Sequence, residues 1–271
     1  EYFGEDPQIK IIVMHIEGIR DGRRFKQVAS RVARKKPVLV LKTGRSLQGA
    51  EAAVSHTGSL VGKDEVWETV FKQCGIIRVD DIDDLSDTVR AFCYLPPMRG
   101  RRIAIVTVSG GFGIIAVDAC IKHRMTLAEF SPATMQKLTK LSPGWLKVGN
   151  PVDLWPMALT SFDSPSPAYL KIMAEVLNDE QVDAVLFFGP TWMEAASPSI
   201  TGIIEELTSA FPDKPIAVCL SDGWLYDIKN DEVAEKLEEM GKAAVFTCSS
   251  RAVKALSRLA KYSEFSVKGG G

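Results

Sequence analysis

A single histidine, His56, stands among small and hydroxyl-bearing residues in the stretch "EAAVSHTGS" (51–59) of a chain that has only three histidines. A neutral imidazole is nucleophilic near pH 7, and it can carry a transferable group. The hydroxyls of Ser55, Thr57 and Ser59 could hold the oxygens of a phosphate beside the ring. Most histidines in proteins have structural roles, so a packed or surface position is the alternative. The residue types favour phosphoryl chemistry at His56.

A carboxylate that could orient this imidazole is Glu17, near the end of the apolar run "IKIIVMHIEG" (9–18). Because this run and "VLVLK" (38–42) predict neighbouring parallel strands, Glu17 should lie at the carboxyl edge of a sheet, where functional residues gather. A carboxylate that accepts a hydrogen bond from one imidazole nitrogen fixes the tautomer and leaves the other nitrogen free to attack. A solvated loop acid is the alternative for Glu17.

A glycine-rich turn, "VSGGFGIIA" (108–116), follows another predicted strand and opens a helix. The backbone N–H groups of Ser109, Gly110 and Gly111 at such a helix start favour an anion, either a phosphate or a carboxylate. The alternative is a turn that needs positive φ, with glycines that let the helix pack against the sheet. We prefer the anion site and keep the structural turn open.

The same stretch contains the spacing G-x-G-x-x-A at Gly111, Gly113 and Ala116, and Glu129 lies near the end of the next apolar run. This spacing is also found in nicotinamide-dinucleotide-binding domains, which makes dinucleotide binding a third interpretation. It ranks below the other two, because short glycine patterns arise often and the acidic residue is loosely placed.

Apolar runs alternate with amphipathic stretches along the whole chain, as in parallel α/β units. The stretch "PPMRGRR" (96–102) predicts a linker between two such series, so we expect domains at 1–96 and 101–265. The regular alternation in the second series is typical of a flavodoxin-like, doubly wound fold. We expect the small-residue segment 43–62 to be a loop and the Pro-, Ser- and Gly-rich region 142–167 to be irregular. The further strands are predicted at 75–79, 103–109, 183–189, 214–220 and 243–247, and the helices at 21–36, 63–74, 81–95, 110–123, 131–141, 166–178, 198–210, 231–240 and 249–264.

The composition excludes several classes of protein. A formal net charge of −1 argues against a nucleic-acid partner, and no apolar run approaches the roughly 18 residues of a membrane span. The five cysteines are scattered without CxxC pairs, so we expect a cytoplasmic protein without a metal site of cysteine ligands. The other histidines, His15 in a strand pattern and His123 at a helix end, fit structural roles.

Three segments resemble one known family. "KTGRSLQGAEAAVSHTGSLVGKDEVWETVFKQCGIIRV" is similar to the phosphohistidine segment of the NDP-forming acyl-CoA synthetases, which include the ADP-forming acetyl-CoA synthetases and are related to succinyl-CoA synthetase. "HIEGIRDGRRF" resembles the acidic motif upstream of that segment, and "VSGGFGIIAVDAC" with "GNPVDLW" resembles the start of the following flavodoxin-like domain. The likeness covers most of the chain, and the SHTG segment is a fairly specific signature.

The resemblance assigns roles to individual residues. His56 matches the histidine that is transiently phosphorylated, and Glu17 matches the glutamate that orients it. Gly110 and Gly111 match the glycine turn of a helix whose N-terminus faces the phosphohistidine in these synthetases. Asn150 and Asp153 match the "NPVD" motif of the same domain, for which we assign no role.

The resemblance also implies a reaction, in which an acyl-CoA, ADP and phosphate give the acid, CoA and ATP through an acyl phosphate and a phosphoenzyme. CoA and ADP or ATP with Mg²⁺ would then be substrates of the complete enzyme. The mobile segment 43–62 would carry the phosphate between distant sites. We expect the CoA-binding domain, the ATP-grasp domain and the opening strand of the first domain to lie outside this chain. We therefore expect a piece of a longer enzyme, inactive alone, that works in an oligomer with those two domains or subunits.

Two further functions stay open. Some proteins of this architecture carry an acetyltransferase domain and use the synthetase-like part as a ligand-sensing regulatory module. The presence of both His56 and Glu17 favours an enzyme, because a sensor would not need both. The nicotinamide-binding interpretation would be supported by tight NAD binding.

Overall fold

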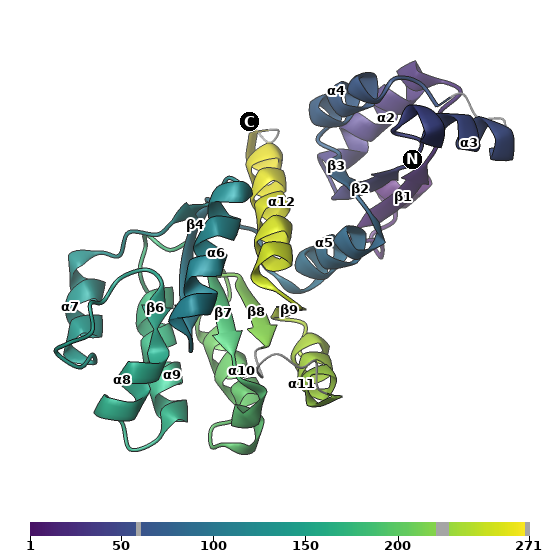
Figure 1. The fold of residues 1–271 in the computed structure, drawn as a ribbon. Helices are drawn as coiled ribbons and strands as arrows, with labels where there is room; N and C mark the ends of the chain where they lie inside the picture. Colours follow the sequence, from purple (N-terminus) through teal and green to yellow (C-terminus); the bar gives the residue numbers. More distant parts are fainter. Residues whose placement is uncertain (58–60, 221–227, 269–271) are drawn as a thin grey trace. The chain divides into compact units, whose positions relative to one another are not determined.

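The computed structural model describes residues 1–57, 61–220 and 228–268, and the chain divides into two compact units. Unit 1 consists of Glu1–Cys93 together with Lys261–Gly271, and unit 2 consists of Tyr94–Ala260. Each unit contains a parallel β-sheet with helices packed on it (Figure 1). The predicted fold class, α/β with parallel sheets of flavodoxin-like type, is confirmed.

The sheet of unit 1 has three parallel strands in the order β1-β2-β3, namely β1 (Ile12–Ile16), β2 (Val38–Lys42) and β3 (Ile77–Val79). Every residue of the central strand β2 is buried, as expected for a strand with helices on both faces. The register pairs Ile16 with Lys42 and Leu41 with Val79, so the three strands end along one edge. That edge is where Glu17 and the segment that contains His56 begin.

The helices of unit 1 begin and end at recognisable residues. Asp21 caps α2 (Gly22–Ala33) by accepting a hydrogen bond from Arg24 N at 2.9 Å. Gly75, in the left-handed conformation with φ 74°, ends α4 (Asp64–Cys74). The remaining helices of this part are α1 (Tyr2–Glu5), α3 (Leu47–Thr57) and α5 (Ile82–Tyr94).

The sheet of unit 2 has the strand order β5-β4-β7-β8-β9, which is the 2-1-3-4-5 order of a flavodoxin-like fold. An additional short strand, β6, pairs with the end of β4 on the side that β5 occupies at its start. The strands are β4 (Arg102–Thr107), β5 (Thr126–Leu127), β6 (Val152–Asp153), β7 (Ala184–Gly189), β8 (Ile216–Leu220) and β9 (Ala244–Phe246).

The helices of unit 2 surround a large apolar core that includes Val106, Tyr169 and Phe187. The described helices are α6 (Gly110–Lys122), α7 (Pro132–Lys140), α8 (Leu154–Ser161), α9 (Pro165–Leu177), the 3-10 helix Thr191–Ala195, α10 (Ile200–Ala210), α11 (Ile228–Glu239) and α12 (Ser249–Lys268).

The last residues of α12 pack with unit 1, although the predicted domains place this helix with the second series. Tyr262 Oη donates a hydrogen bond to Ala33 O at 3.1 Å, and its ring makes an edge contact with Phe92. Phe265 covers Gly75 so closely that a Cβ there would lie 2.3 Å from the ring. These contacts are long-range in sequence and leave no trace in local periodicity.

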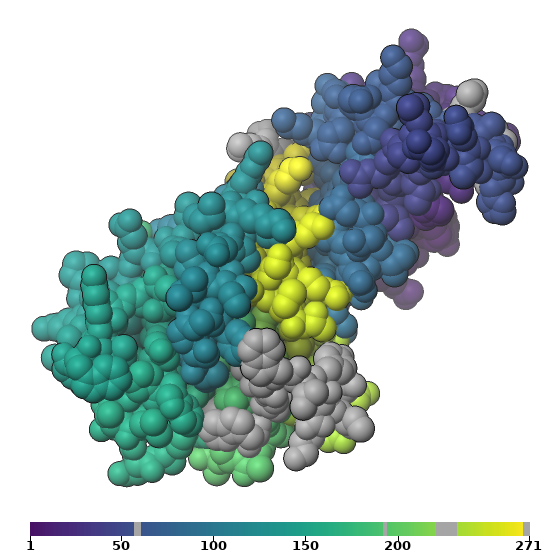
Figure 2. All heavy atoms as spheres, in the orientation of Figure 1, coloured from purple at the N-terminus to yellow at the C-terminus, as the bar shows by residue number. Residues whose placement is uncertain are grey.

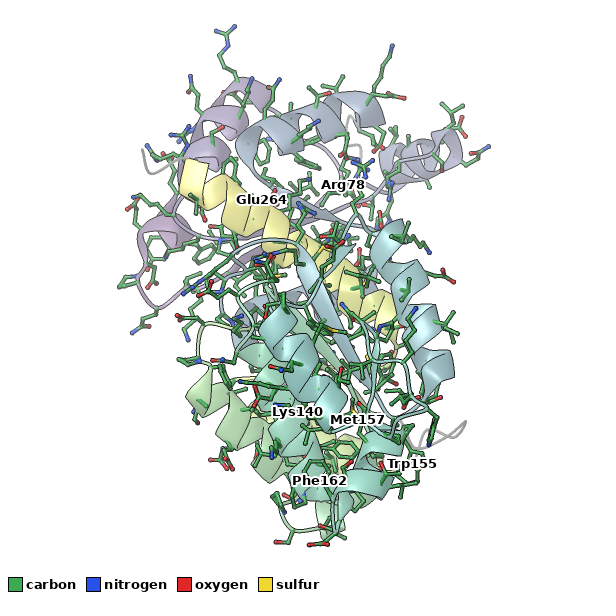
Figure 3. All side chains as sticks on the ribbon, turned by 90° about the vertical axis from the view of Figure 1, so that its left-hand side faces the viewer. Arg78, Lys140, Trp155, Met157, Phe162 and Glu264 are labelled. Carbon is green, nitrogen blue, oxygen red and sulfur yellow. The ribbon has the colours of Figure 1, made fainter. Side chains whose placement is uncertain are left out.

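Two expectations about irregular segments are wrong. The segment 43–62, predicted as a loop, contains the helix α3, and the region 142–167 contains β6, α8 and the start of α9. In the second case Asp153 caps α8 by accepting a hydrogen bond from Trp155 N at 3.3 Å, and Pro156 lies in the first turn, where proline is tolerated. Trp155 and Met157 are labelled on this helix in Figure 3.

Candidate functional site

The sheet edge of unit 1 positions Glu17. The N–H of Thr43 donates to Ile16 O at 3.1 Å, which continues the pairing of β1 and β2 one residue beyond the strands. Glu17 follows directly and is half-buried. On the same edge, His15 Nε2 is 2.9 Å from Thr43 Oγ1, with which it forms a hydrogen bond. Thr43 therefore provides a hydrogen-bond partner for the imidazole of His15.

The segment that contains His56 leaves and rejoins the sheet edge at one place. It leaves at Gly44, which has φ 70°, and a Cβ on Gly44 would lie 2.8 Å from Cγ1 of Val61. Val61 is buried and is followed by Gly62, with φ 71°. The two ends of this segment, at Gly44 and Val61, are thus in contact. Gly44 is itself a left-handed glycine, and Val61 directly precedes another, Gly62.

Within this excursion, α3 begins at a serine cap. Ser46 Oγ accepts a hydrogen bond from Gly49 N at 3.1 Å, and Ser46 O accepts one from Ala50 N at 2.8 Å. The next residues include leucine, glutamine, glutamate and three alanines, which have high helix propensity. The small residues that suggested a loop are therefore helix formers behind a cap, which is the physical reason for the error.

His56 lies in the last turn of α3, and its side chain is exposed. Ser55 beside it is exposed as well. The side chain of Thr57 and all of Ser59 lie outside the described residues. Figure 1 shows α3 projecting from the sheet of unit 1, and Figure 2 shows its atoms at the surface of that unit. The imidazole is accessible to a phosphoryl donor.

The glycine turn of unit 2 starts α6, as predicted. Ser109 is its N-cap residue, but Ser109 N donates to Thr107 Oγ1 at 3.0 Å and so is already satisfied. Gly110 and Gly111 are exposed, and their N–H groups are the first of the helix. The candidate anion donors at this turn are therefore Gly110 and Gly111 rather than all three residues.

Asp153 lies beside this helix start. Its Oδ2 atom is 3.7 Å from the position that a Cβ on Gly110 would take, and β6 pairs Asp153 with Thr107. Burial raises the pKa of Asp153, against the opposing effect of the hydrogen bond from Trp155 N. When it is ionised, this carboxylate repels any anion that approaches Gly110.

Asn150 has a structural role in the same region. Its Nδ2 donates to Ile103 O at 2.8 Å and to Ala128 O at 3.0 Å, and its Oδ1 accepts from Ile105 N at 2.9 Å. These backbone groups lie beside the part of β4 between the residues that pair with β5 and the residues that pair with β6. The asparagine side chain thus satisfies backbone groups in the gap between two short strands.

Gly113, part of the dinucleotide-like spacing, packs against protein. A Cβ there would lie 3.1 Å from Cβ of Pro151 and 3.3 Å from Cγ2 of Thr107. This contact fits a glycine that lets α6 approach its neighbours, and it accounts for Gly113 without a cofactor.

No described helix has the length and apolarity needed to cross a membrane. Between residues 1 and 268, leaving aside 58–60 and 221–227, no group of three or more His, Cys, Asp or Glu could hold a metal ion. The five cysteines, all within the described residues, form no disulfide with one another, and Cys74, Cys120 and Cys219 are buried.

Two family models match the chain. One, described as a succinyl-CoA ligase like flavodoxin domain, matches residues 1–92, and the other, described as a ligase-CoA domain, matches residues 103–265.

Two proteins named as ADP-forming acetate–CoA ligases are similar in sequence to this chain. The alpha subunit of acetate–CoA ligase [ADP-forming] I of Pyrococcus furiosus is 33% identical over 99% of this chain and 56% of its own length. The acetate–CoA ligase [ADP-forming] I of Archaeoglobus fulgidus is 36% identical over 99% of this chain and 36% of its own. The chain thus spans less than two thirds of the length of each of these two relatives.

A solved structure with the same arrangement of elements is the dinucleotide forming acetyl-coenzyme A synthetase 1 of Ca. Korarchaeum cryptofilum, in complex with phosphate and ADP. It superimposes with a TM-score of 0.84 at 28% identity, over 100% of this chain and 57% of the other.

Proposed function

The chain belongs to the NDP-forming acyl-CoA synthetase family, whose ligase-CoA domain matches residues 103–265, and we propose that it carries the phosphohistidine of such an enzyme at His56. The predicted membership of this family is confirmed by the two family models and the similar proteins. The enzyme would interconvert an acyl-CoA, ADP and phosphate with the acid, CoA and ATP. Acetate–CoA ligases [ADP-forming] among the relatives support this reaction class.

The proposed chemistry at His56 has two phosphoryl transfers. In the first, an imidazole nitrogen attacks the phosphorus of an acyl phosphate, an N–P bond forms, and the P–O bond to the acyl group breaks with release of the carboxylate. In the second, an oxygen of the ADP β-phosphate attacks the same phosphorus, and the N–P bond electrons return to the imidazole. Glu17 would accept a hydrogen bond from the other ring nitrogen and so orient the attacking one.

The observation that carries the proposal is the exposed position of His56 on an excursion whose ends meet at Gly44 and Val61. A nucleophile that must meet two different phosphoryl partners needs an accessible ring. It also gains from an attachment at one place, because a shift of α3 about Gly44 then leaves the sheet undisturbed. On this view the helix α3 moves as a short rigid body, in place of the loop that we expected from the sequence.

A phosphoryl group on His56 would need stabilisation from outside α3. His56 lies in the last turn, at the end of the helix where the macrodipole is negative, which disfavours an anion. Separately, in unit 2, the N–H groups of the exposed Gly110 and Gly111 at the start of α6 lie at the positive end of a helix dipole. We propose that a phosphate of the reaction binds at these two glycines, and that Ser55, which is exposed like His56, donates its hydroxyl to a phosphate on α3.

The remaining substrates would bind elsewhere in the complete enzyme. Mg²⁺ would enter the reaction with ADP or ATP, bound mainly through their phosphates. The relatives named as alpha subunits imply further subunits in the same enzyme. We propose that these supply the CoA-binding and ATP-grasp domains and that the enzyme is an oligomer.

The experiment that tests the function uses the complete enzyme and ATP labelled in its terminal phosphate. We expect a protein-bound label that is stable in alkali, labile in acid and lost on addition of ADP. A matched His56→Asn variant should take up no label. If the variant is labelled to the same extent as the natural enzyme, His56 is not the carrier.

A further inference from the structure

Arg45 directly follows Gly44, at the point where the segment that contains His56 leaves the sheet edge. Its Nη1 donates a hydrogen bond to Asp80 Oδ1 at 3.0 Å, and its Nε lies 3.9 Å from Asp64 Oδ2. Asp80 directly follows β3, and Asp64 is the first residue of α4. One guanidinium thus connects the start of the segment to two other elements of unit 1.

The two carboxylates that face Arg45 are held in place by other groups. Asp64 Oδ1 is 2.5 Å from Nη2 of Arg78, which is labelled in Figure 3 and whose side chain is only 10% exposed. The N–H of Asp80 donates to Asp84 Oδ2 at 2.8 Å, in the first turn of α5. The acceptors for Arg45 therefore belong to the fixed part of unit 1, and Arg45 is the group that ties the start of the segment to them.

The returning end of the segment is held in a different way. Val61 is buried, its carbonyl accepts a hydrogen bond from Trp67 Nε1 at 2.7 Å, and the ring of Trp67 packs against Phe71. These enclosed contacts are insensitive to salt. The side chains of Arg45 and Asp80 are 44% and 48% exposed, and salt screens an exposed ion pair. The segment thus has one firmly fixed end and one end held by a weak, charged contact.

Arg45 is far from the ring whose position it could set. His56 lies nine residues after Leu47, the first residue of α3, so it is about 14 Å along the helix from its start. A tilt of about 10° at that start would move the imidazole by about 2 Å. A misplacement of about 1 Å can already slow a reaction about 10²-fold. Arg45 therefore acts on where the nucleophile is presented and not on the phosphoryl group itself.

We propose that Arg45 is a positioning residue for phosphoryl transfer: its ion pairs with Asp80 and Asp64 latch the start of α3 to the sheet edge and so set the position of the His56 ring. This inference rests on the proposed function of His56. Because an exposed ion pair is weak, the latch opens when α3 moves between its two phosphoryl partners and closes when it returns. The enclosed contacts of Val61 keep the other end of the segment fixed meanwhile.

The first test measures the latch in the chain itself and does not depend on phosphorylation. It follows amide hydrogen exchange at Ala50, whose N–H donates to Ser46 O in the first turn of α3. We expect Arg45→Gln and Asp80→Asn each to speed this exchange about twofold to fivefold, as the loss of an exposed ion pair implies, and the double variant to exchange no faster than Arg45→Gln. Added salt should speed exchange in the natural chain more than in Arg45→Gln.

The matched control is Arg31→Gln, from an exposed ion pair with Glu1 at 2.7 Å on α2 of the same unit. It should leave the exchange at Ala50 unchanged. If Arg45→Gln exchanges at the natural rate, or no faster than Arg31→Gln, the latch does not exist and the inference is overturned.

The second test uses the complete enzyme and measures the two phosphorylations of His56 separately, one from ATP and one from an acyl phosphate. Because α3 takes different positions for the two donors, Arg45→Gln should slow one transfer about twofold to fivefold and leave the other unchanged. Arg45→Lys, which keeps a cation near Asp80, should recover most of the lost rate. Equal slowing of both transfers would mean general damage to unit 1, and unchanged rates would mean no role in positioning; either result overturns the inference.

The two proposals fail in different ways. If neither donor labels His56 in the natural enzyme, the proposed function of His56 is wrong, and the inference falls with it as a statement about phosphoryl transfer. The hydrogen exchange at Ala50 still decides whether Arg45 latches α3. If His56 is labelled normally and Arg45→Gln changes neither the exchange nor the ratio of the two rates, the function stands and the latch is wrong.

Discussion

Gly44 and Val61 are in contact at the base of the segment that contains His56, and the side chain of Val61 occupies the space that a Cβ on residue 44 would need. Residues so far apart in sequence meet because the chain leaves the edge of the sheet at one glycine and returns beside it. The candidate nucleophile, His56, therefore lies on a segment whose two ends leave and rejoin the sheet edge at the same place.

We predict that Gly44→Ala disturbs the contact between Gly44 and Val61. The substitution places a Cβ 2.8 Å from Val61 at φ 70°, so strain and overlap add, and unit 1 should lose about 1–3 kcal/mol of stability. Urea unfolding and the rate of tryptic cleavage at Arg45 measure the effect. Gly22→Ala is the control, because nothing lies within 4 Å of the added atom. Equal stability of the two variants would contradict the contact.

A second glycine tests the attachment of α12 to unit 1. Gly75→Ala adds overlap with Phe265, 2.3 Å away, to the strain of φ 74°, whereas Gly241→Ala adds strain alone at φ 66° with nothing within 4 Å. We expect Gly75→Ala to be more destabilising than Gly241→Ala by at least about 1 kcal/mol in thermal unfolding. Similar losses would mean that Phe265 does not cover Gly75 in solution.

Asn150→Ala should destabilise unit 2 without touching the proposed chemistry. It leaves Ile105 N, Ile103 O and Ala128 O without their side-chain partner, which should cost about 3 kcal/mol. Asn178→Ala, at an exposed helix end, is the matched control and should change stability by less than about 0.5 kcal/mol. Chemical unfolding of both variants decides. If Asn150→Ala leaves the stability unchanged, Asn150 again becomes a candidate for ligand binding.

Asp153→Asn should strengthen the binding of inorganic phosphate at the start of α6. The substitution removes a carboxylate 3.7 Å from the Cβ position of Gly110, and it keeps an oxygen that can accept from Trp155 N. Affinity should rise a few-fold, as expected for one nearby charge at a helix end. Phosphate titration followed by the amide NMR signals of Gly110 and Gly111 measures it. If phosphate shifts these signals neither in the natural chain nor in Asp153→Asn, the two glycines form a structural turn and not an anion site.

Acid stability should depend on Asp183. Burial alone would raise the pKa of Asp183, but hydrogen bonds from the Arg102 side chain and backbone outweigh it, and the pKa is lowered. A carboxyl group with a lowered folded-state pKa adds stability above its unfolded-state pKa of about 4, and this contribution is lost as the pH falls through the folded-state value. Asp183→Asn should therefore flatten the decline in melting temperature below about pH 4. Asp213→Asn, from an exposed pair with Arg99, should leave the decline unchanged.

Much of the fold can be read from the sequence, because apolar periodicity is local. The strand Val38–Lys42 and the helix that begins at Gly110 are found where they were expected. The errors have specific causes. The segment before His56 has small side chains that suggest a loop, and its helix depends on a serine cap at Ser46. The packing of Phe265 on Gly75 within unit 1 is a contact between distant parts of the chain, which local periodicity does not reveal.

The candidate site was predictable in its residue types but not in its geometry. Glu17 at a strand end and an exposed His56 follow from pattern and resemblance. The contact of Gly44 with Val61 and the burial of Lys42 do not, because a lysine that ends an apolar strand normally reaches solvent. The use of Ser109 N–H by Thr107 also has no sequence signal.

The central claim is that His56 accepts the phosphoryl group, and residue-level mapping of the phosphorylated protein tests it most directly. The complete enzyme would be treated with an acyl phosphate, digested under alkaline conditions and analysed by mass spectrometry, with His15 and His123 as internal comparisons. The account predicts a phosphate on the imidazole of His56 and on neither of the other two. A phosphate on another residue, with His56 unmodified while the enzyme turns over, would contradict it.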